Sequence, residues 1–127
     1  MSGLGMVTIV VDDYDKAISH YCDDLGFQLI EDTKLDESKR WVVLSTGSTG
    51  MNILLAKAST DAQLAAIGNS TGGRVAFFLY TKNFDQTYAN YQKQGVEFTE
   101  QPRNESFGKV VVFKDAYGNK WDLIERV

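Results

Sequence analysis

Apolar runs, amphipathic stripes and polar turns follow one another in an order that occurs twice along the chain. The β-branched segment Met6–Val11 predicts a strand. Asp13 or Asp15 can cap the helix that follows, and Gly26 suits the left-handed residue that ends it. The apolar face of this helix is formed by Ala17, Ile18, Tyr21, Cys22 and Leu25. Three further strands are predicted at residues 27–33, 40–44 and 52–56.

The second half of the chain repeats this order after a linker. Thr60 and Gln63 predict the capping box of a short helix, and the glycine-rich residues 68–73 predict a flexible connector. The next helix has its apolar face at Phe84, Tyr88 and Tyr91, and Gly95 ends it. Four strands are predicted around it, at residues 74–80, 96–99, 109–113 and 120–125. Residues 101–104, which include the only proline, predict a loop.

The two halves align at a nearly constant offset, which indicates an internal repeat. The matching pairs are Met6 with Arg74, Gly26 with Gly95, Val42 with Val111, and Asn52 with Asp122. We therefore predict an α+β fold of paired βαβββ modules within a single domain, residues 1–127. The modules span about 4–57 and 74–127, and the linker spans 58–73. Because one such module leaves one sheet face unburied, two must pair, within the chain or across a dimer.

Composition narrows the possible partners and the cellular location. The net charge of −4 disfavours non-specific binding to nucleic acid or to an anionic membrane surface, because both need basic patches. Cys22 is the only cysteine, so no internal disulfide can form. We find no signal-peptide pattern at the start and no apolar run long enough to span a membrane. A cytoplasmic protein is the expectation.

Two motifs, at the beginning and end of the chain, resemble those of a known superfamily. Residues 6–17, followed by Tyr21 and Leu25-Gly26-Phe27, resemble the opening of a vicinal oxygen chelate module. Residues 115–123 resemble its closing hairpin, where the family has an Asp-Pro-Xaa-Gly-Asn turn and then a glutamate. This superfamily includes the glyoxalases, the bleomycin-resistance proteins and the extradiol dioxygenases. The resemblance implies curved mixed sheets around a small-molecule pocket, and a homodimer.

The resemblance also implies four positions for a divalent metal, and this chain departs from the family pattern at most of them. The positions are Met6, Asn52, Arg74 and Asp122, where metalloenzymes of the family have histidine, glutamate or glutamine. Met6 offers only a soft thioether, and Asn52 offers a neutral carbonyl. Arg74 is a cation without a lone pair, so Asp122 alone remains a good ligand. We therefore predict that no metal is bound at a site of the glyoxalase type.

The same positions are candidates for binding a ligand. Strand alternation places Thr8 beside Met6, Ala76 beside Arg74 and Ile124 beside Asp122 on the pocket face. Because unpaired buried charges are costly, we expect either that Arg74 pairs with Asp122 or that Arg74 captures an anionic group of a ligand. Arg40 and Arg103 can line the mouth of the pocket. The alternative for all the charged residues is a solvated position at a strand end or edge.

The remaining reactive side chains give little support to catalysis. His20 lies off the apolar stripe of its helix, which favours a solvated position. Cys22 lies on that stripe and is expected to be an inert thiol in the core. A single histidine in this context does not support a catalytic triad.

Three functions remain open at this stage. The first is a metal-free protein that binds a small molecule, as bleomycin-resistance proteins do; the acidic chain weakly favours a cationic ligand. The second is a lyase of the glyoxalase type that uses Ni, Zn or Mn, with Asp122 as one metal ligand. The third is a metal-independent lyase or isomerase in which Asp122 is the general base and Arg74 stabilises an oxyanion. An adjacent Arg74 would lower the pKa of Asp122, which counts against the third function. We prefer the first and leave open whether the protein is an enzyme.

Overall fold

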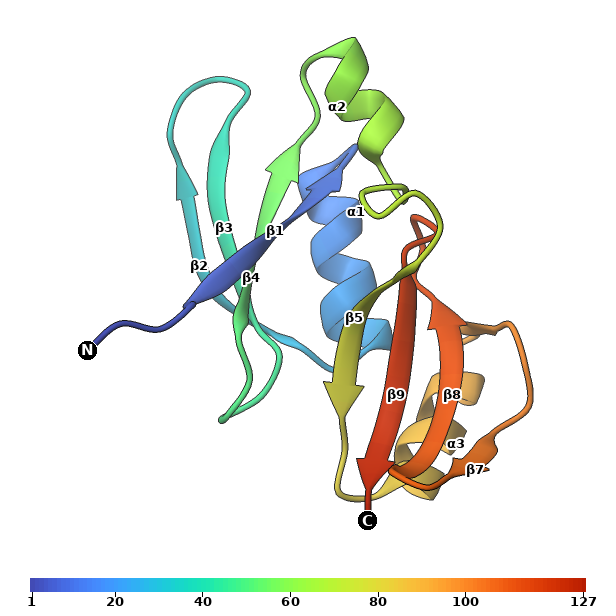
Figure 1. The fold of residues 1–127 in the computed structure, drawn as a ribbon. Helices are drawn as coiled ribbons and strands as arrows, with labels where there is room; N and C mark the ends of the chain where they lie inside the picture. The colour runs from blue at the N-terminus through green and yellow to red at the C-terminus, as the bar shows by residue number, and fades with distance from the viewer. The chain divides into compact units, whose positions relative to one another are not determined.

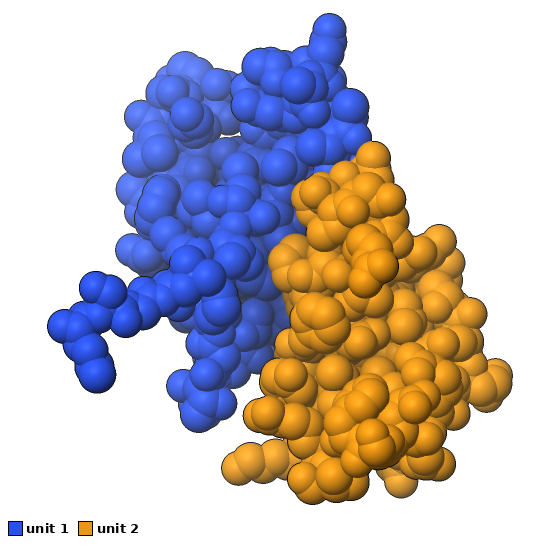
Figure 2. Space-filling model, in the orientation of Figure 1, with its two compact units in different colours: residues 1–67 blue, residues 68–127 orange.

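The computed structural model describes residues 1–127 as two compact units, residues 1–67 and 68–127 (Figure 2). Each unit contains one mixed sheet and a helix against it (Figure 1). Each follows the predicted βαβββ succession along the chain, with the short strand β7 as an addition in unit 2. The α+β class and the curved mixed sheets predicted from the sequence are therefore confirmed. The exact module and linker bounds stay a prediction. None of the helices is long and apolar enough to span a membrane.

Unit 1 contains β1 (Met6–Val11), β2 (Gln28–Lys34), β3 (Arg40–Ser45) and β4 (Asn52–Lys57). The strand order is β1-β4-β3-β2, and the β1–β4 pair is parallel. Helix α1 (Tyr14–Ser19) lies between β1 and β2 along the chain, and α2 (Asp61–Ala66) follows β4. Thr60 accepts the backbone N–H of Gln63 at 3.1 Å, as the capping box predicts. The Gln63 side chain, however, accepts from the backbone N–H of Ser59 rather than from that of Thr60.

Helix α1 begins where the sequence indicates, but its α-helical hydrogen bonding changes to that of a π-helix after Ser19. Of the two candidate caps, Asp13 accepts the backbone N–H of Lys16 at 2.9 Å. The last turn, His20–Asp24, is a π-helix and ends at Gly26, which has a φ of 79°. His20 is only 11% exposed and contacts Asp24 at 2.9 Å, so the predicted solvated position is wrong. A π-turn spaces side chains differently from an α-helix, and the periodicity of the sequence does not reveal this change.

Unit 2 contains β5 (Val75–Tyr80), β6 (Glu97–Phe98), β8 (Gly108–Lys114) and β9 (Lys120–Arg126) in the order β5-β9-β8-β6. Helix α3 (Phe84–Lys93) follows β5. The predicted loop at 101–104 is wrong in part, because β7 (Arg103–Glu105) pairs with the edge of β8. Pro102 has no N–H to donate, so this short strand begins only after it.

Aromatic side chains fill the interface between α3 and the sheet of unit 2. Trp121 stacks on Phe113 with ring centroids 5.8 Å apart, and Tyr91 of α3 meets Phe113 edge-on at 5.4 Å. Trp121 and Phe113 are directly paired on β9 and β8 and therefore share one sheet face. Successive residues of a strand point to opposite faces, so Asp122 and Val112 point away from this core.

Candidate ligand-binding cleft

The face of the unit 2 sheet opposite α3 carries an open cleft of about 630 Å³. This volume lies within the usual range for small-molecule sites. Strands β5, β8 and β9 supply most of its walls. The lining residues are Gly73, Arg74, Val75, Phe78, Thr99, Val112, Lys114, Lys120 and Asp122. Unit 2 alone therefore forms this cleft.

Asp122 lies in the middle of β9 and is the only carboxylate in the cleft lining. Its Oδ1 atom is buried and has no hydrogen-bond partner. Burial raises the pKa of this carboxyl above its ordinary value, while the charge of Arg103 opposes the rise and that of Glu100 adds to it. A carboxylate oxygen buried without a partner is costly, and such a cost is common at binding sites.

Arg74 lines the same cleft but does not pair with Asp122. It is exposed and precedes the first residue of β5, where its carbonyl oxygen accepts the Thr71 hydroxyl at 2.7 Å. Its guanidinium has no ion-pair partner within the chain. Of the two expectations for Arg74, pairing with Asp122 is therefore not seen. Capture of an anionic group stays a prediction.

A β-bulge changes which residues of β5 face the cleft. Val75 pairs with Lys120, and after the irregularity Phe77 pairs with Trp121 and Phe78 with Asp122. The cleft is consequently lined by Val75 and Phe78, and the residue predicted from simple alternation, Ala76, is absent from its lining. Phe78 is 56% exposed, so its ring offers a free apolar surface. The bulge is not marked by any local sequence signal, so Val75 was not predicted in place of Ala76. Phe78 has the same strand parity as Arg74 and Ala76, so simple alternation places it on the cleft face, and the sequence reasoning did not extend that far along the strand.

Two lysines add positive charge to the cleft. Lys120 donates to the Gly73 carbonyl at 3.1 Å, and Lys114 lies 3.8 Å from Glu97. Together with Arg74 they outnumber the single carboxylate of Asp122. The local charge is therefore opposite in sign to that of the whole chain, which is −4.

The predicted site residues of the first half lie in unit 1 and do not line this cleft. Met6 pairs with Asn52 across β1 and β4, and Thr8 pairs with Leu54 two positions further along. Directly paired residues share a sheet face, so Met6, Thr8 and Asn52 lie on the same face of that sheet. Met6 and Asn52 are half-buried, whereas Thr8 is exposed. Their role in ligand binding stays a prediction.

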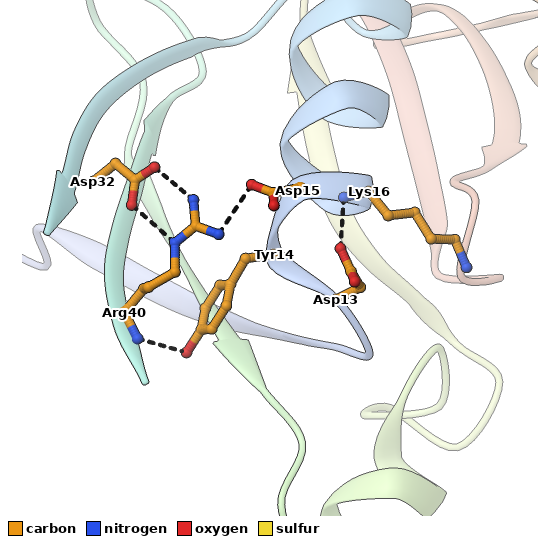
Figure 3. A network of polar contacts seen from close by, with 6 residues as sticks. All are labelled: Asp13, Tyr14, Asp15, Lys16, Asp32 and Arg40. Carbon is orange, nitrogen blue, oxygen red and sulfur yellow. Dashed lines mark hydrogen bonds and ion pairs between the residues drawn. The ribbon is translucent and has the colours of Figure 1, made fainter. Parts of the chain in front are cut away.

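Arg40, one of the two arginines expected at a pocket mouth, is held within unit 1 (Figure 3). Its guanidinium donates two hydrogen bonds to Asp32, at 3.1 and 2.6 Å, and one to Asp15 at 2.9 Å. It also lies over the Tyr14 ring, 5.2 Å from the centroid. These hydrogen bonds raise the pKa of Arg40 and lower that of Asp32. Arg40 therefore ties α1 to the β2–β3 hairpin, and we do not place it in the ligand site.

Arg103 is also engaged in ion pairs within its own unit. From β7 it donates to Glu100 at 2.9 Å and to Glu105 at 2.7 Å, and these bonds raise its pKa. Glu100 in turn accepts the backbone N–H of Val112 at 3.1 Å. Arg103 therefore acts on the cleft through its charge near Asp122 rather than as a free donor.

The donor set does not fit the divalent metal that the superfamily resemblance implies. No group of three or more histidine, cysteine, aspartate or glutamate side chains is arranged to hold a metal ion. Met6 and Asn52 supply a thioether and an amide, and Arg74 supplies a cation without a lone pair. A hard divalent ion needs several carboxylate or imidazole ligands, so one carboxylate is insufficient.

Comparisons with known proteins agree with the fold. The sequence model of the Glyoxalase/Bleomycin resistance protein/Dioxygenase superfamily matches residues 3–123. A protein of Shewanella frigidimarina, described as uncharacterized, is 47% identical over 94% of this chain and 90% of its own length. The crystal structure of UcmS2 is 27% identical with a TM-score of 0.83 and covers 98% of both chains. TnmS3, an antibiotic binding protein from Streptomyces sp. CB03234, is 23% identical with a TM-score of 0.80 and covers 100% of this chain and 98% of its own.

The family match covers nearly the whole chain. The two mixed sheets and the Asp115–Asn119 turn are consistent with it. In that turn Asp115 accepts the side-chain amide of Asn119 and the indole N–H of Trp121, each at 3.0 Å. The chain belongs to the glyoxalase/bleomycin resistance/dioxygenase (vicinal oxygen chelate) superfamily.

Proposed function

We propose that this protein binds a small organic molecule in the cleft of unit 2, and that it does so without a metal. The observation that carries the proposal is the buried Oδ1 of Asp122, which has no partner and lies in the same cleft as the unpaired Arg74 and the exposed ring of Phe78. Such a combination of one aromatic surface with a few polar groups is typical of small-molecule sites. The antibiotic-binding neighbour TnmS3 supports the same class of function.

The metal-free part of the proposal can be tested directly. The protein is purified without a histidine tag, and bound metals are measured by plasma mass spectrometry before and after dialysis against Ni, Zn and Mn. We expect no retained metal, because Asp122 is the only good ligand among the four positions. Near-stoichiometric retention, with lactoylglutathione formation that is lost in Asp122→Ala, would replace the proposal with a glyoxalase-type lyase.

The binding part is tested by a thermal-shift screen of small organic molecules. A hit should be confirmed by isothermal titration calorimetry on the wild type and on Phe78→Ala, which removes the aromatic surface from the cleft. We expect weaker binding in the variant. A ligand whose affinity does not change in Phe78→Ala, Arg74→Gln or Asp122→Asn would show that this cleft is not the site.

A second candidate function is proton transfer by Asp122, in an enzyme that needs no metal. It is favoured by one observation: burial shifts the pKa of Asp122 upward, the direction that favours a general base, and Arg74 forms no ion pair that would oppose this shift. The hit from the screen is incubated with the protein in D₂O and followed by NMR. Deuterium incorporation or product formation that disappears in Asp122→Asn would establish an enzyme.

The proposal also includes a homodimer and a cytoplasmic location. Tyr80 and Phe78 are both more than half exposed on the cleft face, and an apolar sheet face of this kind can pair with a second copy. The single cysteine suits a reducing compartment. Sedimentation velocity should give twice the mass of the chain, and a purely monomeric species at micromolar concentration would contradict the dimer.

A further inference from the structure

The charges and free groups of the unit 2 cleft restrict the chemistry of its ligand further than the proposed function does. Arg74 is the only cation of the cleft lining whose side chain makes no hydrogen bond or ion pair within the chain. Lys120 bonds to the Gly73 carbonyl, and Lys114 lies near Glu97. A free guanidinium presents a planar fork of N–H donors, which matches the geometry of a carboxylate. The anion-binding part of the cleft is therefore Arg74.

The same distribution of charge disfavours a cationic ligand. A ligand ammonium near Asp122 would also lie in a cleft that carries Arg74, Lys114 and Lys120. Like charges brought together cost free energy that the attraction of a single carboxylate does not recover. The unpaired Oδ1 of Asp122 nevertheless needs a hydrogen-bond donor. A neutral O–H or N–H on the ligand satisfies this oxygen without adding positive charge.

Phe78 restricts the shape of the ligand. Its ring is exposed on the cleft side of β5, directly paired with Asp122 in the register of β5 and β9. A flat aromatic ring can stack on it while its substituents reach the charged groups on either side. Strand pairing thus brings the apolar surface and the unpaired carboxylate to neighbouring positions.

We propose that the cleft selects an aromatic carboxylate that carries a neutral hydroxyl or N–H donor. The ligand carboxylate pairs with Arg74, its ring stacks on Phe78, and its donor binds Oδ1 of Asp122. This inference rests on the proposed function, since it names the ligand class of the same cleft. It reverses the weak expectation of a cationic ligand that the net charge of the whole chain suggests.

Three probes of one shape test the inference on the wild-type protein by calorimetry: hydroxynaphthoate, naphthoate and naphthylmethylammonium. We expect hydroxynaphthoate to bind about tenfold more tightly than naphthoate, because one hydrogen bond to a charged acceptor is gained. We expect no measurable binding of the ammonium compound. Equal affinities of hydroxynaphthoate and naphthoate, or tighter binding of the ammonium compound, would overturn the inference.

Single substitutions then test the contacts that Arg74 and Asp122 are proposed to make with the ligand. Arg74→Gln should weaken hydroxynaphthoate binding by about 10- to 100-fold, whereas Lys82→Gln, an exposed cation of the same unit outside the cleft, should leave it unchanged. Asp122→Leu should abolish the advantage of hydroxynaphthoate over naphthoate, so that the two probes bind this variant with equal affinity. A loss in Lys82→Gln as large as in Arg74→Gln would show that only the overall charge matters and would reject the Arg74 contact.

The outcome separates this inference from the proposed function. If none of the three probes binds, but the thermal-shift screen finds a neutral or cationic compound whose affinity falls in Phe78→Ala, the inference fails and the proposed function stands. If no compound binds and the protein retains a stoichiometric metal, both fail. Should Asp122→Leu not fold, the comparison of the three probes on the wild type and on Arg74→Gln still decides the inference.

Discussion

Unit 1 and unit 2 each contain arginine and aspartate at one site, but the charges are paired in unit 1 and unpaired in unit 2. In unit 1, Arg40 is saturated by Asp32 and Asp15 and lies over Tyr14. In unit 2, Arg74 forms no ion pair, and Oδ1 of Asp122 is buried without a partner. Saturated charges stabilise the fold, whereas unsatisfied ones cost stability and remain available to a ligand. The comparison teaches that the residue types alone do not distinguish a structural cluster from a binding site.

The largest expected difference is between Arg40→Ala and Arg74→Ala. Arg40→Ala removes a two-bond contact with Asp32 and leaves that carboxylate unpaired, so we expect it to lower the free energy of unfolding by about 2 kcal/mol. Arg74→Ala should change it by less than about 0.5 kcal/mol, because the exposed Arg74 side chain makes no hydrogen bond or ion pair that unfolding would break. Urea unfolding of both variants measures the difference. Equal losses would contradict the contrast between the two units.

The contribution of Arg40 should also depend on pH. Arg40 lowers the pKa of Asp32 below its ordinary value of 3.8. The folded state therefore favours the ionised carboxylate, and its stabilisation is present above pH 3.8 and is lost as the pH falls through the lowered pKa. The difference in unfolding free energy between wild type and Arg40→Ala should shrink at the acid end of this window. A difference that stays constant down to pH 2 would mean that packing against Tyr14, rather than charge, dominates.

Asp122→Asn is expected to raise the free energy of unfolding, by less than Arg40→Ala lowers it. Its pKa is raised mainly by burial, so the folded state disfavours the ionised form. Asp122→Asn should therefore stabilise the protein at pH 7, by about 1 kcal/mol because the group is only partly buried. The gain is expected to fall to zero once the pH is below the ordinary value of 3.8, where Asp122 is neutral in both states. Thermal unfolding across this range measures it, and destabilisation at pH 7 would indicate a structural role for Asp122.

The smallest expected change in unfolding free energy concerns the ion pair between Arg40 and Asp15. The Asp15 side chain is largely exposed, so water screens its ion pair with Arg40. Asp15→Asn should cost less than about 0.5 kcal/mol, whereas Asp32→Asn should approach the effect of Arg40→Ala. Urea unfolding of the two variants side by side ranks the contacts. A larger loss in Asp15→Asn than in Asp32→Asn would reverse the order inferred from the geometry.

Several features of the fold follow from local sequence. The strand Met6–Val11, the cap at Asp13 and the left-handed Gly26 each depend on a residue and its immediate neighbours. The repeat of the two halves and the α+β class follow from the spacing of such features. Two local departures were not predictable: the π-turn that partly buries His20 and the strand at Arg103–Glu105. The short strand depends on pairing with β8, and the π-turn changes the spacing of the backbone hydrogen bonds; the periodicity of apolar residues contains neither.

The sequence by itself determined the superfamily, the repeat of two mixed sheets and the poor donor set at Met6, Asn52, Arg74 and Asp122. Only the tertiary structure decided which charged groups are satisfied. It pairs Arg40 with Asp32, forms no ion pair between Arg74 and Asp122, and through the bulge in β5 places Val75 rather than Ala76 in the cleft. The physical reason is that hydrogen-bond satisfaction and side-chain direction depend on strand register and on distances of a few ångströms, whereas fold class depends on the spacing of apolar residues along the chain.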